Sequence, residues 1–261
     1  MEDLKEIVRS KYAKLAVEKD QSCCSTDCCS PKDEVTIMSE DYSKLDGYVA
    51  DADLNLGCGM PTEFARIEPG VTVLDLGSGA GNDVFIARQL TGETGEVLGI
   101  DFTEEMIKKA NANKAKLGFD NVRFIQGDIE DMPIPSNSID VCVSNCVMNL
   151  VPNKQKAYDE VYRVLKPGGH FSISDIVTLG ELTDDVRKTA ELYAGCVSGA
   201  LPKEDYLNHI KQAGFSDIKI DKERLIELPD SVLLEHITQD ALKAFRDSGA
   251  SVYSINVFAR K

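Results

Sequence analysis

The feature that most constrains the fold is a glycine-rich turn between an apolar run and a helix-like segment. The apolar run covers residues 71–76, the turn contains Gly77, Gly79 and Gly81, and helical spacing follows over residues 82–90. Glycine lets a backbone turn tightly and approach a ligand closely, and the N-terminus of the next helix carries a partial positive charge. A turn in this position is typical of α/β proteins that bind nucleotides.

The alternation of strands and helices continues along the chain. Further strands are expected at residues 96–101, 122–126, 139–144, 170–175, 217–221 and 251–259, and further helices at residues 103–117, 154–165, 203–213 and 231–247. Strands that alternate with helices form right-handed crossovers and a mostly parallel sheet. Because the strands are apolar on both faces, we expect helices on both sides of that sheet, in a Rossmann-like α/β fold.

Two segments interrupt this pattern. Residues 2–19 show helical spacing of apolar side chains and are followed by a cysteine-rich stretch, so residues 1–60 are expected to form an N-terminal helix and arm. Residues 61–261 are expected to form one domain. A cap containing a helix at residues 183–193 is expected to be inserted in it, at about residues 176–202.

The charge balance excludes several classes of partner. The chain has 29 Lys and Arg against 44 Asp and Glu, a net charge of −15. Such a protein repels phosphate backbones, so nucleic acid is not expected as a partner. No apolar run approaches the ~20 residues of a membrane span, and the charged first 20 residues lack the apolar stretch of a signal peptide. We therefore expect a cytoplasmic protein with no membrane partner.

Acidic residues at two strand positions distinguish between possible cofactors. Asp101 ends the second expected strand, where a carboxylate can bind both ribose hydroxyls. An NAD fingerprint would place its third glycine at Asn82, whereas this chain has it one residue earlier, at Gly81. Asp75, just before the turn, would face a cationic amino acid group. S-adenosylmethionine carries an ammonium and a sulfonium and no pyrophosphate, so the pattern favours it over NAD.

The later strand ends supply further cofactor contacts. Asp128 and Ile129 follow the third strand and are expected at the adenine amino group and ring, and Asn145 is expected at the methionine moiety. The expected cofactor-binding residues are Asp75, Gly77, Gly79, Gly81, Asp101, Phe102, Met106, Asp128, Ile129 and Asn145. Together with the run YRVLKPGG before the fifth strand, these residues resemble the class I S-adenosylmethionine-dependent methyltransferases over about residues 70–175. The resemblance implies a seven-stranded sheet whose last strand is antiparallel.

The chain has eight cysteines, more than packing usually requires. Thiols in a reducing compartment indicate metal or metalloid binding, or redox chemistry, rather than structural disulfides. Cys58 lies between two glycines, Cys146 follows the fourth strand at the cofactor edge, and Cys196 lies in the cap, whereas Cys142 lies inside a strand and is assigned to packing. Soft thiolates select soft ions. Trivalent arsenic is one, and its lone pair can attack an electrophilic methyl group.

Four sequence segments resemble the arsenite S-adenosylmethionine methyltransferase family: Gly57-Cys58-Gly59, the loop at residues 75–83, SNCVMNL at residues 144–150 and GCVSGAL at residues 195–201. The similarity runs over about residues 1–215. It implies that Cys146 and Cys196 hold arsenic(III) during methyl transfer. Cys58 would be a third thiol, which binds arsenic or cycles through a disulfide with an N-terminal cysteine. Cys29 is favoured for that role by its distance to Cys58, with Cys28 next.

The resemblance also implies the other participants in the reaction. Arsenite or its thiol conjugates would be the substrate, S-adenosylmethionine the methyl donor, and glutathione or thioredoxin the reductant. The resulting activity would be arsenite methylation, a detoxification reaction. The cluster of Cys23, Cys24, Cys28 and Cys29 has two further interpretations: a zinc site, or an arm that captures metalloid and passes it inward.

Two other functions remain compatible with the sequence. A class I methyltransferase acting on a small organic acceptor, such as a quinone-like carbon, would keep its activity when Cys146 and Cys196 are replaced by serine. A non-enzymatic thiol protein that binds metalloid would bind arsenite tightly without the cofactor, but it would leave the glycine loop without a purpose.

Overall fold

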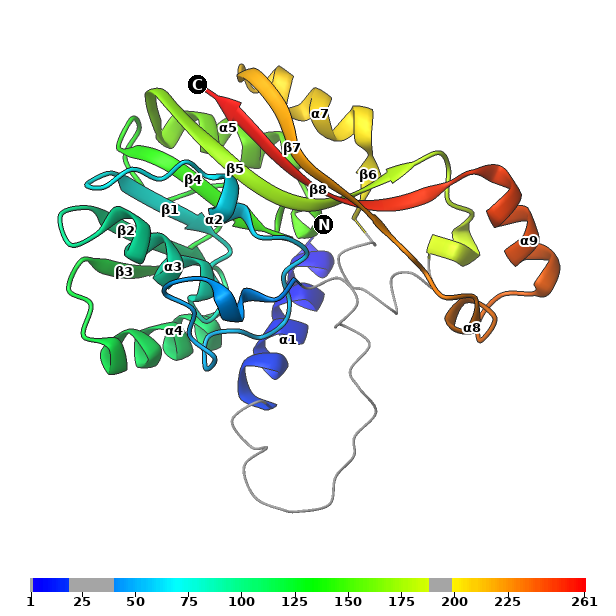
Figure 1. Cartoon of the computed structure of the whole chain (residues 1–261), viewed down its shortest axis with the longest axis horizontal. Helices are drawn as coiled ribbons and strands as arrows, with labels where there is room; N and C mark the ends of the chain where they lie inside the picture. Colours follow the sequence, from blue (N-terminus) through cyan, green and yellow to red (C-terminus); the bar gives the residue numbers. More distant parts are fainter. Residues whose placement is uncertain (1, 19–39, 188–198) are drawn as a thin grey trace, which may run out of the picture.

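A central sheet organises the computed structural model, which describes residues 2–18, 40–187 and 199–261. Its strands lie in the order β3-β2-β1-β4-β5-β8-β7 (Figure 1). Their bounds are β1 Thr72–Leu76, β2 Glu96–Asp101, β3 Val122–Gln126, β4 Ile139–Asn145, β5 Leu165–Leu179, β7 Ser216–Ile226 and β8 Ser251–Arg260. The strands from β1 to β5 pair in parallel, and β8 is antiparallel to both of its neighbours. The mostly parallel α/β sheet is therefore confirmed.

One additional short strand brings the sheet to eight strands instead of the expected seven. This strand, β6, covers only Leu201–Pro202 and pairs with β5 beside the main order. A two-residue strand has no alternation of apolar and polar side chains that a sequence pattern could reveal. The antiparallel orientation of the last strand agrees with the expectation.

Helices cover both faces of the sheet, as expected. In the described part of the chain they are α1 Glu2–Glu18, α2 Pro61–Phe64, α3 Asn82–Thr91, α4 Glu104–Leu117, α5 Lys154–Val164, α7 Lys203–Gln212, α8 Asp230–Leu233 and α9 Gln239–Ser248, with 3-10 turns at Tyr42–Lys44 and Met148–Leu150. On one face, Tyr158 of α5 and Tyr206 of α7 pack with Leu74 of β1 in a fully buried cluster. On the other face, Phe85 of α3 packs with Val73. Val73 and Leu74, which are neighbours in β1, therefore pack into two separate hydrophobic cores on opposite faces of the sheet.

The C-terminal part differs from the sequence expectation. One helix was expected over residues 231–247, and that expectation is wrong: the structure has α8 and α9 separated by a short turn. The break has a local cause, because the Thr238 side chain accepts a hydrogen bond from the Ala241 amide and starts a new helix. None of the described helices is long and apolar enough to cross a membrane.

Two strands are also longer than expected. β5 begins at Leu165 and absorbs the turn expected at residues 166–169. It continues to Leu179, into the segment expected to begin the cap, because β8 pairs with it as far as Ser251. β7 runs to Ile226 for the same reason. Of the helix expected at residues 183–193, residues 184–187 are helical, and residues 188–193 lie outside the described part of the chain.

Candidate active site

A pocket lies at the carboxyl ends of β1, β2 and β4, where the sequence placed the cofactor. The expected residues that line it are Asp75, Gly77, Gly79, Asp101, Phe102, Met106, Asp128, Ile129 and Asn145. Gly81 does not line the pocket. It caps α3 with a φ of 100°, and a Cβ there would lie 2.8 Å from the Phe124 ring, so its glycine is needed for packing.

The glycine loop is held open toward the pocket by Asp101. One oxygen of this carboxylate accepts a hydrogen bond from the Gly79 amide at 3.0 Å, and the other accepts one from the Thr103 amide at 2.8 Å. A Cβ placed on Gly79 would meet no atom within 4 Å. Ser78 Oγ and Asn82 Oδ1, on lining residues, are buried and have no hydrogen-bond partner among the described residues. The open space above Gly79 is therefore available to a ligand.

Three buried acidic side chains, those of Asp75, Asp83 and Asp101, line the pocket. Burial raises the pKa of Asp75 well above its usual range, and the nearby Asp83 and Asp101 raise it further. Burial also raises the pKa of Asp83 to about 6, against the lowering effect of hydrogen bonds from Asn145 and Tyr42. Carboxylates crowded in this way favour a bound cation, which relieves their mutual repulsion. The ammonium and sulfonium of S-adenosylmethionine fit this requirement. Sequence reasoning missed Asp83.

Helix α1 covers the side of the pocket that contains Asp128. The Lys5 ammonium lies 2.6 Å from an Asp128 oxygen and 2.8 Å from a Glu130 oxygen, and Val8 and Tyr12 of the same helix line the pocket. Partial burial alone would raise the pKa of Asp128, but hydrogen bonds from Lys5 and the Glu130 amide outweigh it and lower that pKa. The sequence predicted α1 but not its place across the pocket.

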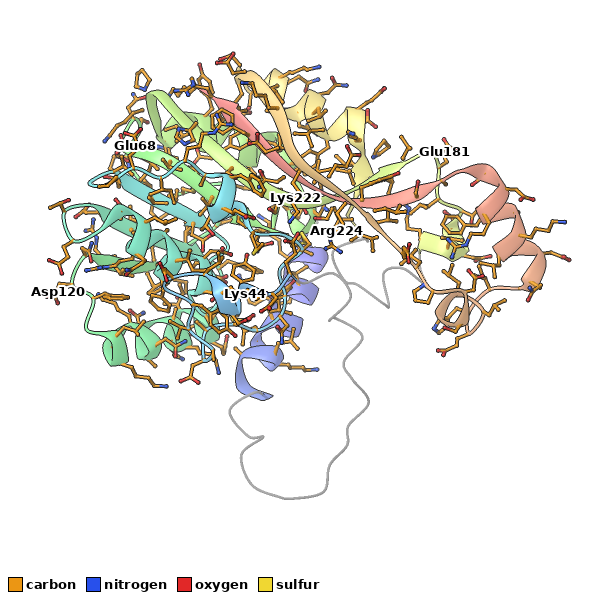
Figure 2. The ribbon with its side chains drawn as sticks, viewed as in Figure 1. Lys44, Glu68, Asp120, Glu181, Lys222 and Arg224 are labelled. Carbon is orange, nitrogen blue, oxygen red and sulfur yellow. A yellow bond between two sulfur atoms is a disulfide. The ribbon has the colours of Figure 1, made fainter. Side chains whose placement is uncertain are left out.

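Basic residues of β7 approach the pocket from the opposite side. Lys222 and Arg224 project from this strand near the centre of the molecule (Figure 2). Lys222 lies 2.6 Å from a carboxylate oxygen of Glu40, a lining residue, and Arg224 lies 3.8 Å from the other oxygen. The Arg224 guanidinium also donates to the Cys58 carbonyl at 3.5 Å. These pairs attach the segment before Cys58 to the C-terminal half of the sheet.

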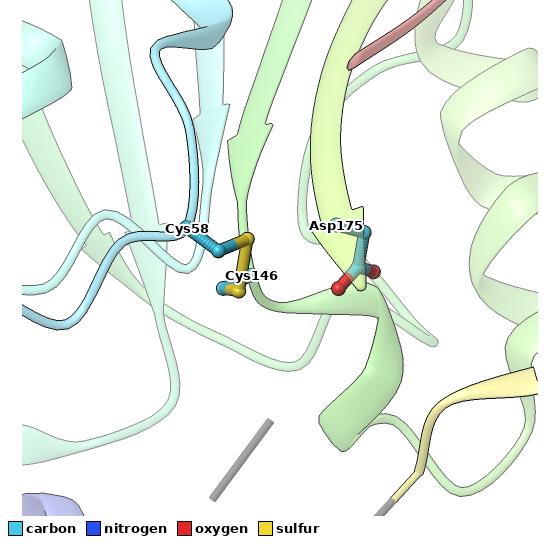
Figure 3. A group of neighbouring side chains, drawn as sticks. All are labelled: Cys58, Cys146 and Asp175. Atoms are coloured by element: carbon cyan, nitrogen blue, oxygen red, sulfur yellow. A yellow bond between two sulfur atoms is a disulfide. The ribbon is translucent and has the colours of Figure 1, made fainter. Parts of the chain in front are cut away.

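Two buried cysteines lie side by side at the edge of the pocket. Cys58 and Cys146 form a disulfide with a Cα–Cα distance of 5.8 Å (Figure 3). Cys146 also lines the pocket. The Asp175 carboxylate faces this pair, and one of its oxygens and the two sulfurs all lie within 4.8 Å of one another. The structure thus brings together two thiol positions that are 88 residues apart in sequence.

Asp175 comes from the middle of β5 and is fully buried. Burial raises its pKa to about 7, although hydrogen bonds from the Ile176 and Asn149 amides and from the Tyr206 hydroxyl oppose the shift. It was missed as a site residue because an acidic residue inside a long strand has no signature of its own. Its register beside Asn145 and Cys146 becomes visible only when β4 and β5 are paired.

The other cysteines divide into two groups. Cys142 is buried in the apolar core, and burial raises the pKa of its thiol, which agrees with a packing role. Cys23, Cys24, Cys28, Cys29 and Cys196 lie outside the described residues. The role expected for Cys196 as an arsenic ligand and that expected for Cys29 therefore stay predictions.

Comparisons with known proteins agree with this geometry. Residues 67–231 match the family model described as a methyltransferase domain. The arsenite methyltransferase of Halobacterium salinarum is 40% identical over 277 aligned positions, which cover 100% of this chain and 67% of that protein. The human arsenite methyltransferase is 39% identical over 170 positions, which cover 62% of this chain and 45% of that protein. The chain thus spans about two thirds of the archaeal relative and less than half of the human one.

A solved structure gives the same result. The crystal structure of an arsenic(III) S-adenosylmethionine methyltransferase from Chlamydomonas reinhardtii superposes with a TM-score of 0.67 and 32% sequence identity. The superposition covers 89% of this chain and 75% of that one. With its class I fold, its carboxylate-lined pocket and its paired cysteines, this chain belongs to the arsenite methyltransferase family.

Proposed function

We propose that this protein transfers the methyl group of S-adenosylmethionine to trivalent arsenic held by cysteine thiolates. The observation that carries the proposal is the position of Cys146, which lines the carboxylate-rich pocket and lies beside Cys58. A soft metalloid bound to this pair is adjacent to the donor site. Family membership and the names of the relatives support the same reaction.

The pocket residues would bind and orient the methyl donor. The glycine loop and Asp101 suit the ribose, the side of the pocket with Asp128 and Ile129 suits the adenine, and the buried Asp75 and Asp83 suit the cationic methionine moiety. S-adenosylmethionine supplies an electrophilic methyl group on its sulfonium. Orientation of donor and acceptor is the main source of acceleration that this arrangement offers, because arsenic has no proton to lose and needs no general base.

The thiol chemistry requires the reduced protein. Two thiols displace two hydroxides of arsenite as water, which leaves an arsenic atom with two sulfur ligands and one hydroxyl. Cys196 is the proposed third sulfur ligand. The arsenic lone pair then attacks the methyl carbon, and the electrons of the broken carbon–sulfur bond stay on sulfur. Since the Cys58–Cys146 disulfide offers no thiolate, a thiol reductant such as glutathione or thioredoxin must first donate two electrons. The cytoplasm provides such a reducing environment.

An arsenic speciation assay tests the proposal. Reduced protein is incubated with arsenite, S-adenosylmethionine and excess glutathione or thioredoxin, and the arsenicals are separated and quantified. We expect methylated arsenicals from the wild type and at least a hundredfold loss in Cys58→Ser and Cys146→Ser proteins. Cys142→Ala is the matched control, because that thiol is buried in the core, and it should retain activity.

The assay also separates the competing functions. A wild-type protein that binds S-adenosylmethionine but forms no methylated arsenical would reject the proposal in favour of an organic acceptor. Tight arsenite binding by protein that has no affinity for S-adenosylmethionine would instead identify a metalloid-binding protein.

A further inference from the structure

The side-chain amide of Asn145 hydrogen-bonds to the loop that carries Cys58. Its Oδ1 accepts a hydrogen bond from the Cys58 amide at 2.9 Å. Its Nδ2 donates to the Gly59 carbonyl at 2.8 Å and to the Tyr42 hydroxyl at 2.6 Å, and an oxygen of Asp83 lies 3.2 Å away. The orientation of the amide is unambiguous, because a backbone N–H only donates and a carbonyl only accepts.

We propose that Asn145 is a positioning residue that holds Cys58 beside Cys146, rather than a ligand of the cofactor. This inference rests on the proposed function, in which both thiols bind one arsenic atom. Asn145 directly precedes Cys146 at the end of β4, so a single residue fixes the backbone of one cysteine and hydrogen-bonds to the other. Both of its N–H groups already have acceptors in the protein, which leaves the amide no free donor for the methionine carboxylate.

The glycines on either side of Cys58 fit this role. A Cβ on Gly57 would lie 2.5 Å from Asn145 Nδ2, and a Cβ on Gly59 would lie 2.7 Å from Ser174 Oγ. Both distances are shorter than real side chains allow. The Gly-Cys-Gly sequence therefore lets the backbone approach close enough for the Asn145 amide to span it.

Other hydrogen bonds hold the two cysteines from their remaining sides. The Cys58 carbonyl accepts from Ser254 Oγ at 2.6 Å. The Cys146 amide donates to the Ser174 carbonyl at 2.8 Å, and the φ of Cys146 is 60°, in the left-handed region. The Asn145 amide links these two anchored segments directly, in addition to the disulfide between their cysteines. Two thiols fixed at this separation bind a common atom without the entropy cost of bringing the loops together.

The proposal predicts a change in thiol chemistry that is independent of methylation. Reduced protein is equilibrated with mixtures of reduced and oxidised glutathione. In this reaction Cys58 and Cys146 lose two electrons to form their disulfide, and oxidised glutathione is reduced to two thiols. The disulfide fraction is followed by alkylation and peptide mass analysis of this pair. We expect the equilibrium constant to fall about tenfold in Asn145→Ala protein, as the loss of one or two hydrogen bonds implies.

A second variant keeps the test valid if Asn145→Ala protein does not fold. Gly57→Ala retains Asn145 but forces its amide away from the loop, so the equilibrium constant should fall in the same direction. Asn111→Ala, on the exposed face of α4, is the matched control and should behave as the wild type. The affinity for S-adenosylmethionine is measured by calorimetry at a pH of about 8.5, where Asp83 stays ionised even without its hydrogen bond from Asn145. At this pH it should change less than about threefold in Asn145→Ala protein.

Two results would overturn the inference. One is a wild-type disulfide equilibrium in both the Asn145→Ala and Gly57→Ala proteins. The other is a loss of S-adenosylmethionine affinity in Asn145→Ala protein with no change in that equilibrium, which would make Asn145 a cofactor ligand. Neither readout requires methylated arsenic, so a failure of the proposed function and a failure of this inference are distinguishable.

Discussion

At the residue scale, two features place Cys58 beside Cys146: the close approach of the Cys58 loop to the end of β4, and the left-handed backbone of Cys146. Cys146 adopts a left-handed φ of 60° directly after β4. A residue with a Cβ pays about 1–2 kcal/mol for this conformation. The position still needs a side chain, because glycine would relieve the strain but remove the sulfur. Strain of this kind, held by surrounding hydrogen bonds, is typical of functional sites.

Ionisation of Asp83 should control how strongly the pocket attracts a cation. Its pKa is raised to about 6 by burial, so the carboxyl of the free protein becomes protonated as the pH falls through this value. A neutral carboxyl does not attract the ammonium or sulfonium. We predict that the affinity for S-adenosylmethionine falls as the pH is lowered from about 7.5 to about 5. Below the pKa of Asp83, the loss of affinity should approach about tenfold for each pH unit. Calorimetric titration across this range measures the effect.

Two variants check the assignment to Asp83. Asp83→Asn should bind more weakly at neutral pH and lose most of the pH dependence. Asp120→Asn, in the exposed turn between α4 and β3 (Figure 2), should keep the wild-type profile. A full pH dependence in Asp83→Asn protein would assign the effect to another group.

At the scale of elements, the strands that carry the pocket are predicted within about one residue. β2 and β3 match the expected ranges. The carboxyl ends of parallel strands meet at one edge, which is why Asp101, Asp128 and Cys146 could be placed together from sequence. β5 and β7 are longer than expected, because pairing with β8 extends them.

Residues supplied by irregular or distant segments could not be placed from sequence. Lys5, Tyr42 and Glu40 reach the pocket from outside the strand–helix pattern. Their positions depend on packing between segments more than 30 residues apart, such as the contact of Tyr42 with Asp83. A periodic pattern reports which face of an element is buried, but not which other element buries it.

We expect the ion pairs of helix α1 to contribute to cofactor affinity. Its Lys5 pairs with Asp128 and Glu130, and its Arg9 lies over the Phe102 ring. Because the ion pairs are partly exposed, they are worth about 0.2–1 kcal/mol. Lys5→Ala should therefore weaken S-adenosylmethionine binding about two- to fivefold and increase amide hydrogen exchange along α1.

A second lysine on the same helix supplies the control for this experiment. Lys14 is exposed, and Lys14→Ala should leave both the affinity and the exchange rates unchanged. Added salt should narrow the difference between wild type and Lys5→Ala protein, since it screens the ion pairs. Equal effects of Lys5→Ala and Lys14→Ala would mean that α1 affects binding through its overall charge, and not through the ion pairs by which Lys5 holds the helix against the pocket.

At the scale of the whole molecule, the thiol pair lies where two parts of the sheet meet. The parallel strands β1, β2 and β4 carry the donor pocket. Cys58 and Cys146 instead belong to an apolar cluster with Ile176 of β5, Val252 of β8 and Phe245 of α9. Cys146 also lines the pocket, so the two cysteines lie between the pocket and the C-terminal extension of the sheet, the part in which sequence-based element boundaries were least accurate.

The same architecture buries several carboxyl groups, and their raised pKa values link the stability of the ligand-free protein to pH. Burial raises the pKa of Asp83 to about 6 and that of Asp175 to about 7, against about 3.9 for an aspartate in an unfolded chain. At pH values between the unfolded-state pKa and the folded-state pKa of each group, the folded state binds more protons than the unfolded state. The free energy of unfolding therefore falls as the pH rises through this range, until the folded-state pKa is passed. We predict that Tm, measured by differential scanning calorimetry, falls by several degrees between pH of about 5 and about 8, since each kcal/mol corresponds to about 2–4 °C in a protein of this size.

Comparison of variants separates this linkage from the general repulsion of a chain with a net charge of −15. Asp175→Asn should reduce the slope of Tm against pH, whatever its effect on Tm itself, because the substituted side chain no longer titrates. Asp120→Asn removes the same charge from the surface and should leave the slope as it is. Saturating S-adenosylmethionine should also flatten the slope, since the bound cation stabilises the ionised form of Asp83. A slope that is equal in all three proteins, with and without the ligand, would show that the buried carboxyls do not control the pH dependence and that net surface charge does.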